Sequence, residues 1–172
     1  MREVAVPALS NGPLRFLPKA ILESRQPLRA IIVGWLTAAL PAILVAAVVV
    51  SLMPSSEQPQ LPVSGWLDAI WKLAIFAPIT ESLIMGAALS LLLRVTPPAA
   101  AIVLSATGWA IVHSVAAPVW GLVIWWPFLI FSTVYVVWRT RGFLAGVAMA
   151  AAVHGMNNLL PAIAIAAGPA LS

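Results

Sequence analysis

Hydrophobic and polar positions divide the chain into long apolar runs separated by short polar breaks. A helix needs about 20 largely apolar residues to cross a membrane. Five runs meet this length, at about residues 29–52, 64–94, 97–115, 118–138 and 143–167. The pattern therefore predicts an all-α fold, a polytopic transmembrane helix bundle with about five spans.

Two of the prolines inside these runs bear on where the spans bend or end. Pro41 is a candidate kink in the first run. The second run is longer than one span requires, and Pro78 is expected to kink or break it. Residues 64–76 are therefore a candidate for a separate interfacial or re-entrant helix.

The overall composition agrees with a membrane protein. Hydrophobic residues make up 62% of the 172 positions and charged residues only 8%, against about 25% charged in typical soluble domains. A soluble chain of this length could not bury so much apolar surface. We expect one transmembrane domain at residues 29–170 after a basic segment at 1–28. That segment suits an amphipathic helix on the membrane surface and an unstructured tail equally well.

The positive charges predict how the bundle is oriented. Lys and Arg gather before the first run and at Arg94, Arg139 and Arg141, which all fall on one side if there are five spans. The positive-inside tendency then places the N-terminus in the cytoplasm. Lys72 is the exception, and Asp68, four residues earlier, is expected to pair with it. The net charge of +4 forms no basic stripe, so no nucleic-acid partner is expected.

A few polar side chains interrupt the apolar runs, where each ionised group costs roughly 2.5–3.5 kcal/mol. They are Glu81 in the second run, His113 in the third, and His154 with Asn158 in the fifth. Each ionisable residue lies roughly 20 Å along its helix from the cytoplasmic end, at about 1.5 Å per residue. Spacing i, i+4 puts His154 and Asn158 on one helix face. We therefore expect the four side chains to meet, whereas Asn157 is expected to bond a neighbouring helix or carbonyl.

A carboxylate, two imidazoles and a carboxamide suit the activation of water. The carboxylate or a histidine can remove a proton from water. The N–H groups of imidazole and carboxamide can stabilise the oxyanion of a tetrahedral intermediate. The candidate catalytic residues are Glu81, His113, His154 and Asn158.

Three short motifs carry these residues in order, and together they resemble a known family. They are APITESLIMG at 77–86, WAIVH at 109–113 and HGMNN at 154–158. The CPBP superfamily of CAAX prenyl proteases and bacteriocin-processing (Abi-type) membrane proteins has E-E-x-x-x-R after a proline, then F-x-x-x-H and H-x-x-x-N. The likeness covers about residues 70–160. Ser82 stands at the second glutamate, Gly86 at the arginine and Trp109 at the phenylalanine.

The resemblance implies an intramembrane endopeptidase that hydrolyses a peptide bond of a membrane-associated substrate. Glu81 and a histidine would activate water, and His154 with Asn158 would bind the oxyanion. A metal-free mechanism is preferred, and zinc held by Glu81, His113 and His154 is the alternative. The substrate would be a hydrophobic, lipidated or membrane protein, with membrane lipid as the surroundings and the bacterial inner membrane as the location.

The missing glutamate and arginine support a second interpretation. If the two pair in the family, losing both avoids an orphaned charge. A catalytically inactive relative would serve as a membrane scaffold or as a subunit of a larger membrane complex.

The sequence lacks the motifs that mark other classes of intramembrane hydrolase. The sequence has no H-E-x-x-H and no G-x-S-x-G, and its one aspartate, Asp68, excludes an aspartyl dyad. The absence of cysteine excludes disulfides and thiolate metal sites. Gly142 and Gly146 form a G-x-x-x-G motif, which predicts close helix packing. Tryptophans near the run ends are expected to be interfacial anchors: Trp66, Trp71, Trp120 and Trp138.

Overall fold

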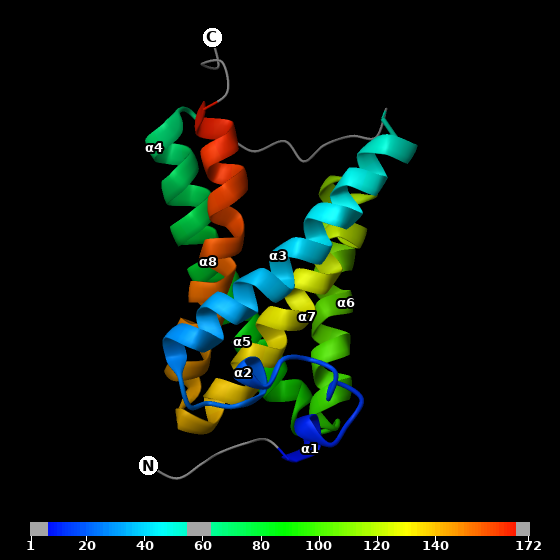
Figure 1. Cartoon of the computed structure of the whole chain (residues 1–172), viewed down its shortest axis with the longest axis vertical. Coiled ribbons are helices and arrows are strands. Elements are labelled where there is room, and N and C mark those ends of the chain that lie inside the picture. The colour runs from blue at the N-terminus through cyan, green and yellow to red at the C-terminus, as the bar shows by residue number, and fades with distance from the viewer. Residues whose placement is uncertain (1–6, 55–62, 168–172) are drawn as a thin grey trace.

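The fold comes from a computed structural model that describes residues 7–54 and 63–167. Five helices in these ranges are long and apolar enough to cross a membrane (Figure 1). They are α3 (Pro27–Leu52), α4–η1–α5 (Trp66–Leu92), α6 (Pro98–Ala116), α7 (Trp120–Trp138) and α8 (Phe143–Ala167). The prediction of an all-α, polytopic bundle is confirmed, and the chain is an integral, multi-pass membrane protein.

The second span is one continuous helix, although its turns change width. It begins as α4 (Trp66–Ala69), widens to the π-helix η1 (Ile70–Phe76) and continues as α5 (Ala77–Leu92). The predicted break at Pro78 is wrong, and residues from 66 onward do not form a separate piece. Pro78 follows directly after the wide turns of η1, and the helix continues through it as α5. The first span likewise continues through Pro41.

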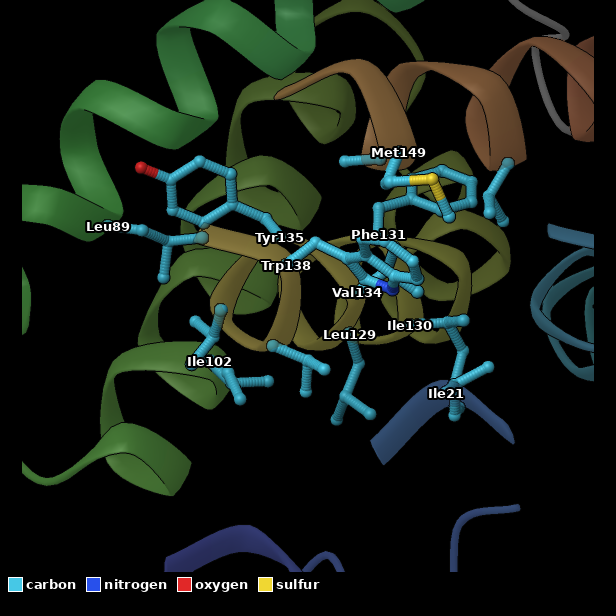
Figure 2. Packing of buried hydrophobic residues seen from close by; sticks show 14 of the residues in the cluster. Ile21, Leu89, Ile102, Leu129, Ile130, Phe131, Val134, Tyr135, Trp138 and Met149 are labelled. Atoms are coloured by element: carbon cyan, nitrogen blue, oxygen red, sulfur yellow. The ribbon is translucent and has the colours of Figure 1, made fainter. Parts of the chain in front are cut away.

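Helix α7 forms the centre of the bundle. It is apolar on every side, as a helix surrounded by others should be, and its residues from Pro127 to Trp138 are all buried. It packs against α3, α6 and α8. Figure 2 shows Phe131, Val134 and Tyr135 of α7 within a cluster that also includes Leu89 of α5 and Ile102 of α6.

The N-terminal segment folds under the bundle. The short helices α1 (Pro7–Ser10) and α2 (Lys19–Leu22) lie at the end where α3 begins (Figure 1). The described part of the segment is thus neither one amphipathic helix nor a loose tail. Phe16 is 63% exposed, but five other apolar side chains of the segment are part of the core, with at most 4% of their surface exposed: Leu9, Leu14, Leu17, Ile21 and Leu22.

The two ends of the bundle differ in charge. The start of α3, the end of α5 and the short 3₁₀ helix η2 (Arg139–Arg141) share one end in Figure 1, and they carry Arg29, Arg139 and Arg141. The second span starts at the opposite end, where the predicted pair forms: Lys72 Nζ lies 2.9 Å from a carboxylate oxygen of Asp68. Gathering the arginines at one end is what five spans require. That this end faces the cytoplasm stays a prediction.

The tryptophans near the span ends do not all behave as anchors. Trp66 and Trp71 are more than half exposed, as an interfacial position requires. Trp138 is buried, and the guanidinium of Arg141 lies 5.1 Å from the centre of its ring. For Trp138 the prediction of an interfacial anchor is therefore wrong, because a ring packed inside the protein is not free to insert between lipid headgroups.

The ring of Tyr135 fits against two glycines from neighbouring helices. A Cβ on Gly86 of α5 would lie 2.7 Å from Tyr135 Cε2, and one on Gly146 of α8 would lie 2.9 Å from Tyr135 Cδ2. The expected close packing is thus confirmed at Gly146. Gly142 has φ +123°, which permits the turn into α8, and a Cβ there would meet no atom within 4 Å, so the expected close packing is not found at this position.

We expect Gly86→Ala to lower the free energy of unfolding by about 1–3 kcal/mol, because the added methyl overpacks the core. A Cβ on Gly108, inside α6, would meet no atom within 4 Å. Gly108→Ala is thus a matched control, expected to be neutral or stabilising by up to about 1 kcal/mol. Denaturant unfolding of the purified variants in detergent measures both values. Equal stability of the two variants would contradict the packing around Tyr135.

Candidate functional site

Glu81, His154 and Asn158 meet inside the bundle between α5 and α8. Glu81 Oε2 lies 3.9 Å from His154 Nε2, and Asn158 Nδ2 lies 3.2 Å from the same nitrogen. The His154 side chain is 5% exposed, whereas that of Glu81 is 25% exposed. The carboxylate is therefore easier for other molecules to reach than the imidazole. The predicted meeting of the second and fifth spans is confirmed for these three residues.

The hydrogen bonds of Asn158 determine how its amide is oriented. Its Nδ2 also lies 3.1 Å from the backbone oxygen of Leu73. A carbonyl oxygen only accepts hydrogen bonds, so the amide nitrogen must face it. The two hydrogens of Nδ2 then go to Leu73 O and to His154 Nε2. Neither is left for a substrate oxyanion, which differs from the role expected for Asn158.

The same bonds indicate where the proton of His154 resides. Nε2 accepts from Asn158, so the neutral ring carries its hydrogen on Nδ1. The ring is stacked on Phe131 of α7 at 4.5 Å between centroids. Phe128, one turn earlier, meets it edge-on at 5.3 Å. Contacts on several sides thus hold the imidazole beside Glu81.

His113 approaches the trio through an aromatic ring and not by direct contact. Its ring lies 5.4 Å from that of Phe128, which also touches His154. His113 Nδ1 donates to the backbone oxygen of Trp109 at 2.9 Å, so its Nε2 keeps a free lone pair. Trp109 itself stacks on Phe128 at 4.7 Å. Within the part of the chain that the structure describes, no polar contact joins His113 to Glu81, His154 or Asn158.

Sequence reasoning missed the two phenylalanines that line the site. Phe128 and Phe131 are spaced i, i+3, which puts them on one face of α7. They lie in a run that is aromatic and aliphatic throughout, and no motif distinguishes them from its other apolar residues. Only their placement against the histidines shows what they do.

Asn157 has a partner other than the one expected. Its Nδ2 lies 3.5 Å from Oδ1 of Asn158 on the same helix. The expectation of a bond to another helix or to a carbonyl of the backbone is wrong. The contact places a second amide against the acceptor side of Asn158.

Ser82 and Gly86, two of the three positions that differ from the motifs the sequence resembles, are both buried. Ser82 is buried, and its Oγ has no hydrogen-bond partner among the described residues. At Gly86 the ring of Tyr135 occupies the space that a side chain would need. Tyr135 is held there by Ser90 Oγ, 2.8 Å from its hydroxyl. An arginine at position 86 would therefore require α7 to repack.

The residues proposed for zinc do not form a metal site as placed. In residues 7–54 and 63–167, no three His, Asp or Glu side chains gather closely enough to hold a metal ion. The rings of His113 and His154 each contact the ring of Phe128, and within the described chain no ring contact joins the two histidines to each other. The set Glu81, His113 and His154 thus does not fit the close tetrahedral arrangement that zinc requires.

A wide apolar groove of about 800 Å³ lies on another face of the same helices. Ile75, Ile79 and Leu83 line it from the second span, and Ala148 and Ala152 line it from α8. Glu81 lies two residues from both Ile79 and Leu83, so it points away from this face. None of the four candidate site residues lines the groove.

Comparisons of the chain with models of protein families, with curated proteins and with solved structures found no match.

Proposed function

We propose that the protein is an intramembrane endopeptidase of the CPBP type that hydrolyses a peptide bond of a membrane-associated substrate. The observation that supports this most is the pair formed by Glu81 and His154. An ionisable residue within a span marks function by default, and here two of them from separate spans lie 3.9 Å apart. The location proposed with this function is the bacterial inner membrane, with the arginine-rich end in the cytoplasm.

Glu81 is the residue assigned to activate water. At 3.9 Å from His154 Nε2 it is beyond direct hydrogen-bond distance, so its oxygens can accept from water. The carboxylate takes a proton from water while the water oxygen bonds to the carbonyl carbon of the substrate. It then passes that proton to the amide nitrogen as the C–N bond breaks. A carboxyl and an amine terminus result, and Glu81 is restored.

The other side chains of the site are assigned to hold one another in place and to polarise the carbonyl group of the substrate. His154 is fixed by Phe131 and Asn158, and the hydrogen on its Nδ1 is the one that the neutral ring can donate to an oxyanion. His113 donates from Nδ1 to the backbone oxygen of Trp109, and its ring contacts Phe128 as the ring of His154 does. Asn158 is assigned a positioning role, because both its amide hydrogens are already used. No step in this scheme passes through a metal.

A second candidate function has one specific observation in its favour. Position 86, an arginine in the family, is a glycine covered by Tyr135, and the neighbouring Ser82 has an unpartnered hydroxyl. These two positions therefore carry no charged pair beside Glu81. A catalytically inactive scaffold or a subunit of a larger membrane complex would keep the bundle without the chemistry.

Hydrolysis can be detected before the substrate is known. The purified protein is reconstituted in liposomes with solubilised membrane protein from the expression host and a synthetic prenylated peptide, in water enriched in oxygen-18. We expect new carboxyl termini that carry the heavy oxygen, found by mass spectrometry and absent from empty liposomes. They should form equally with a chelator present.

Two outcomes of this experiment would contradict the proposal. Loss of cleavage with chelator would contradict the metal-free scheme and favour zinc. No labelled termini from either substrate source would contradict the endopeptidase and favour the scaffold. The variant Glu23→Gln is the control, because it removes a carboxylate outside the spans, and this protein should cleave the substrate as fast as the wild type does.

A further inference from the structure

The π-helix η1 ends where Pro78 follows it, and the N–H that proline lacks is the one that the carbonyl of Leu73 would accept. In a π-helix each N–H bonds the carbonyl five residues earlier, and the N–H of Ala77 accordingly donates to Lys72 O. The next carbonyl in this ladder, Leu73 O, would bond residue 78. Proline has no N–H, so the ladder cannot supply Leu73.

Asn158 supplies the missing donor from the opposite helix. Its Nδ2 lies 3.1 Å from Leu73 O. In a membrane an unsatisfied carbonyl costs several kcal/mol, and neighbouring helices commonly satisfy the one that a proline frees. Gly155 allows the approach, because a Cβ there would lie 2.6 Å from the backbone oxygen of Ala74. The absent N–H of Pro78 therefore explains why an amide is stable at this depth of α8.

The freed carbonyl also sets the state of the histidine. Because Leu73 O takes one hydrogen of Nδ2, the amide cannot turn its oxygen toward the second span. The other hydrogen then points to His154 Nε2 at 3.2 Å. The chain of contacts runs from Pro78 through Leu73 and Asn158 to the imidazole that lies beside Glu81.

We propose that Pro78 is a positioning residue: by freeing Leu73 O it orients Asn158, which holds His154 with Nε2 unprotonated and Nδ1 protonated. This rests on the proposed function only for the role that it gives His154 in catalysis. The tautomer is a property of the resting protein and does not depend on cleavage.

The test is nitrogen-15 NMR of the full chain, labelled at both histidines, in detergent micelles. In the wild type we expect Nε2 of His154 to show the shift of an unprotonated, hydrogen-bonded nitrogen. Pro78→Ala restores an N–H to the ladder and releases Asn158, so His154 should lose this shift and sample both tautomers. Asn158→Leu removes the amide and should give the same loss.

The second histidine and a second proline serve as controls. His113, held by Trp109 O, should keep its shifts in both variants. Pro41→Ala, which alters a proline inside α3, should leave both histidines unchanged. A protonated Nε2 on His154 in the wild type, or His154 shifts that keep their wild-type values in Pro78→Ala and Asn158→Leu, would overturn the proposal. Shifts lost at His113 as well as at His154 would also overturn it, because the effect of Pro78 would then not be confined to the path through Leu73 and Asn158.

Discussion

Glu81→Gln is expected to lower kcat/KM for peptide hydrolysis by roughly 10²–10⁴-fold, the range that a general base contributes. Glutamine has the size of glutamate, so the packing beside His154 is kept while the proton acceptor is lost. The measurement is the initial rate of substrate cleavage in liposomes at a fixed ratio of protein to lipid. The substrate is the one found by oxygen-18 labelling.

The control variant removes the same negative charge at a position far along the sequence from the site. Glu23→Gln also removes one carboxylate, but from the N-terminal segment, and its rate should equal that of the wild type. The circular dichroism of both variants should show the same helix content. An unchanged rate in Glu81→Gln would exclude Glu81 as the base.

Gly155→Ala is expected to reduce the free energy of unfolding by about 3 kcal/mol, at the upper end of overpacking costs. The new methyl would lie 2.6 Å from the backbone oxygen of Ala74, and a backbone atom cannot turn aside as a side chain can. Helix α8 must then move away from η1, which lengthens the bond from Asn158 to Leu73. Denaturant unfolding in detergent measures the loss.

The effect of Gly155→Ala should exceed that of an equivalent change elsewhere. Gly108→Ala, where the methyl enters open space, provides the reference. The histidine shifts of Gly155→Ala should also change at His154 and not at His113. Stability equal to that of Gly108→Ala would show that α8 and η1 do not approach each other closely.

The spans were predictable from sequence because a membrane fixes their length. Each needs about 20 apolar residues, and the breaks are marked by charges or prolines; the third helix begins at Pro98, within one residue of the prediction. The fate of Pro78 was not predictable in this way. A proline can kink, break or be absorbed by a widened turn, and the outcome depends on the donor that Asn158 provides from 80 residues away.

Part of the site was predictable for the same reason. Counting residues from the charged ends gave the depths of Glu81 and His154, and the structure brings these two together. Depth does not give rotation about the helix axis or the neighbours in between. The position of Phe128 between the histidines, and the use of both Asn158 hydrogens, follow from helix packing and have no signature in the sequence.

The central claim is that the carboxylate of the second span and the imidazole of the fifth lie side by side within the bundle. The chain has no cysteine, so the double variant Glu81→Cys with His154→Cys can be treated in membranes with a short thiol cross-linker. We predict an intramolecular link for this pair. We predict none for Glu81→Cys with Leu160→Cys, because Leu160 is exposed and lies closer than His154 to the C-terminal end of α8. No link at 81 and 154, or equal linking of both pairs, would contradict the claim.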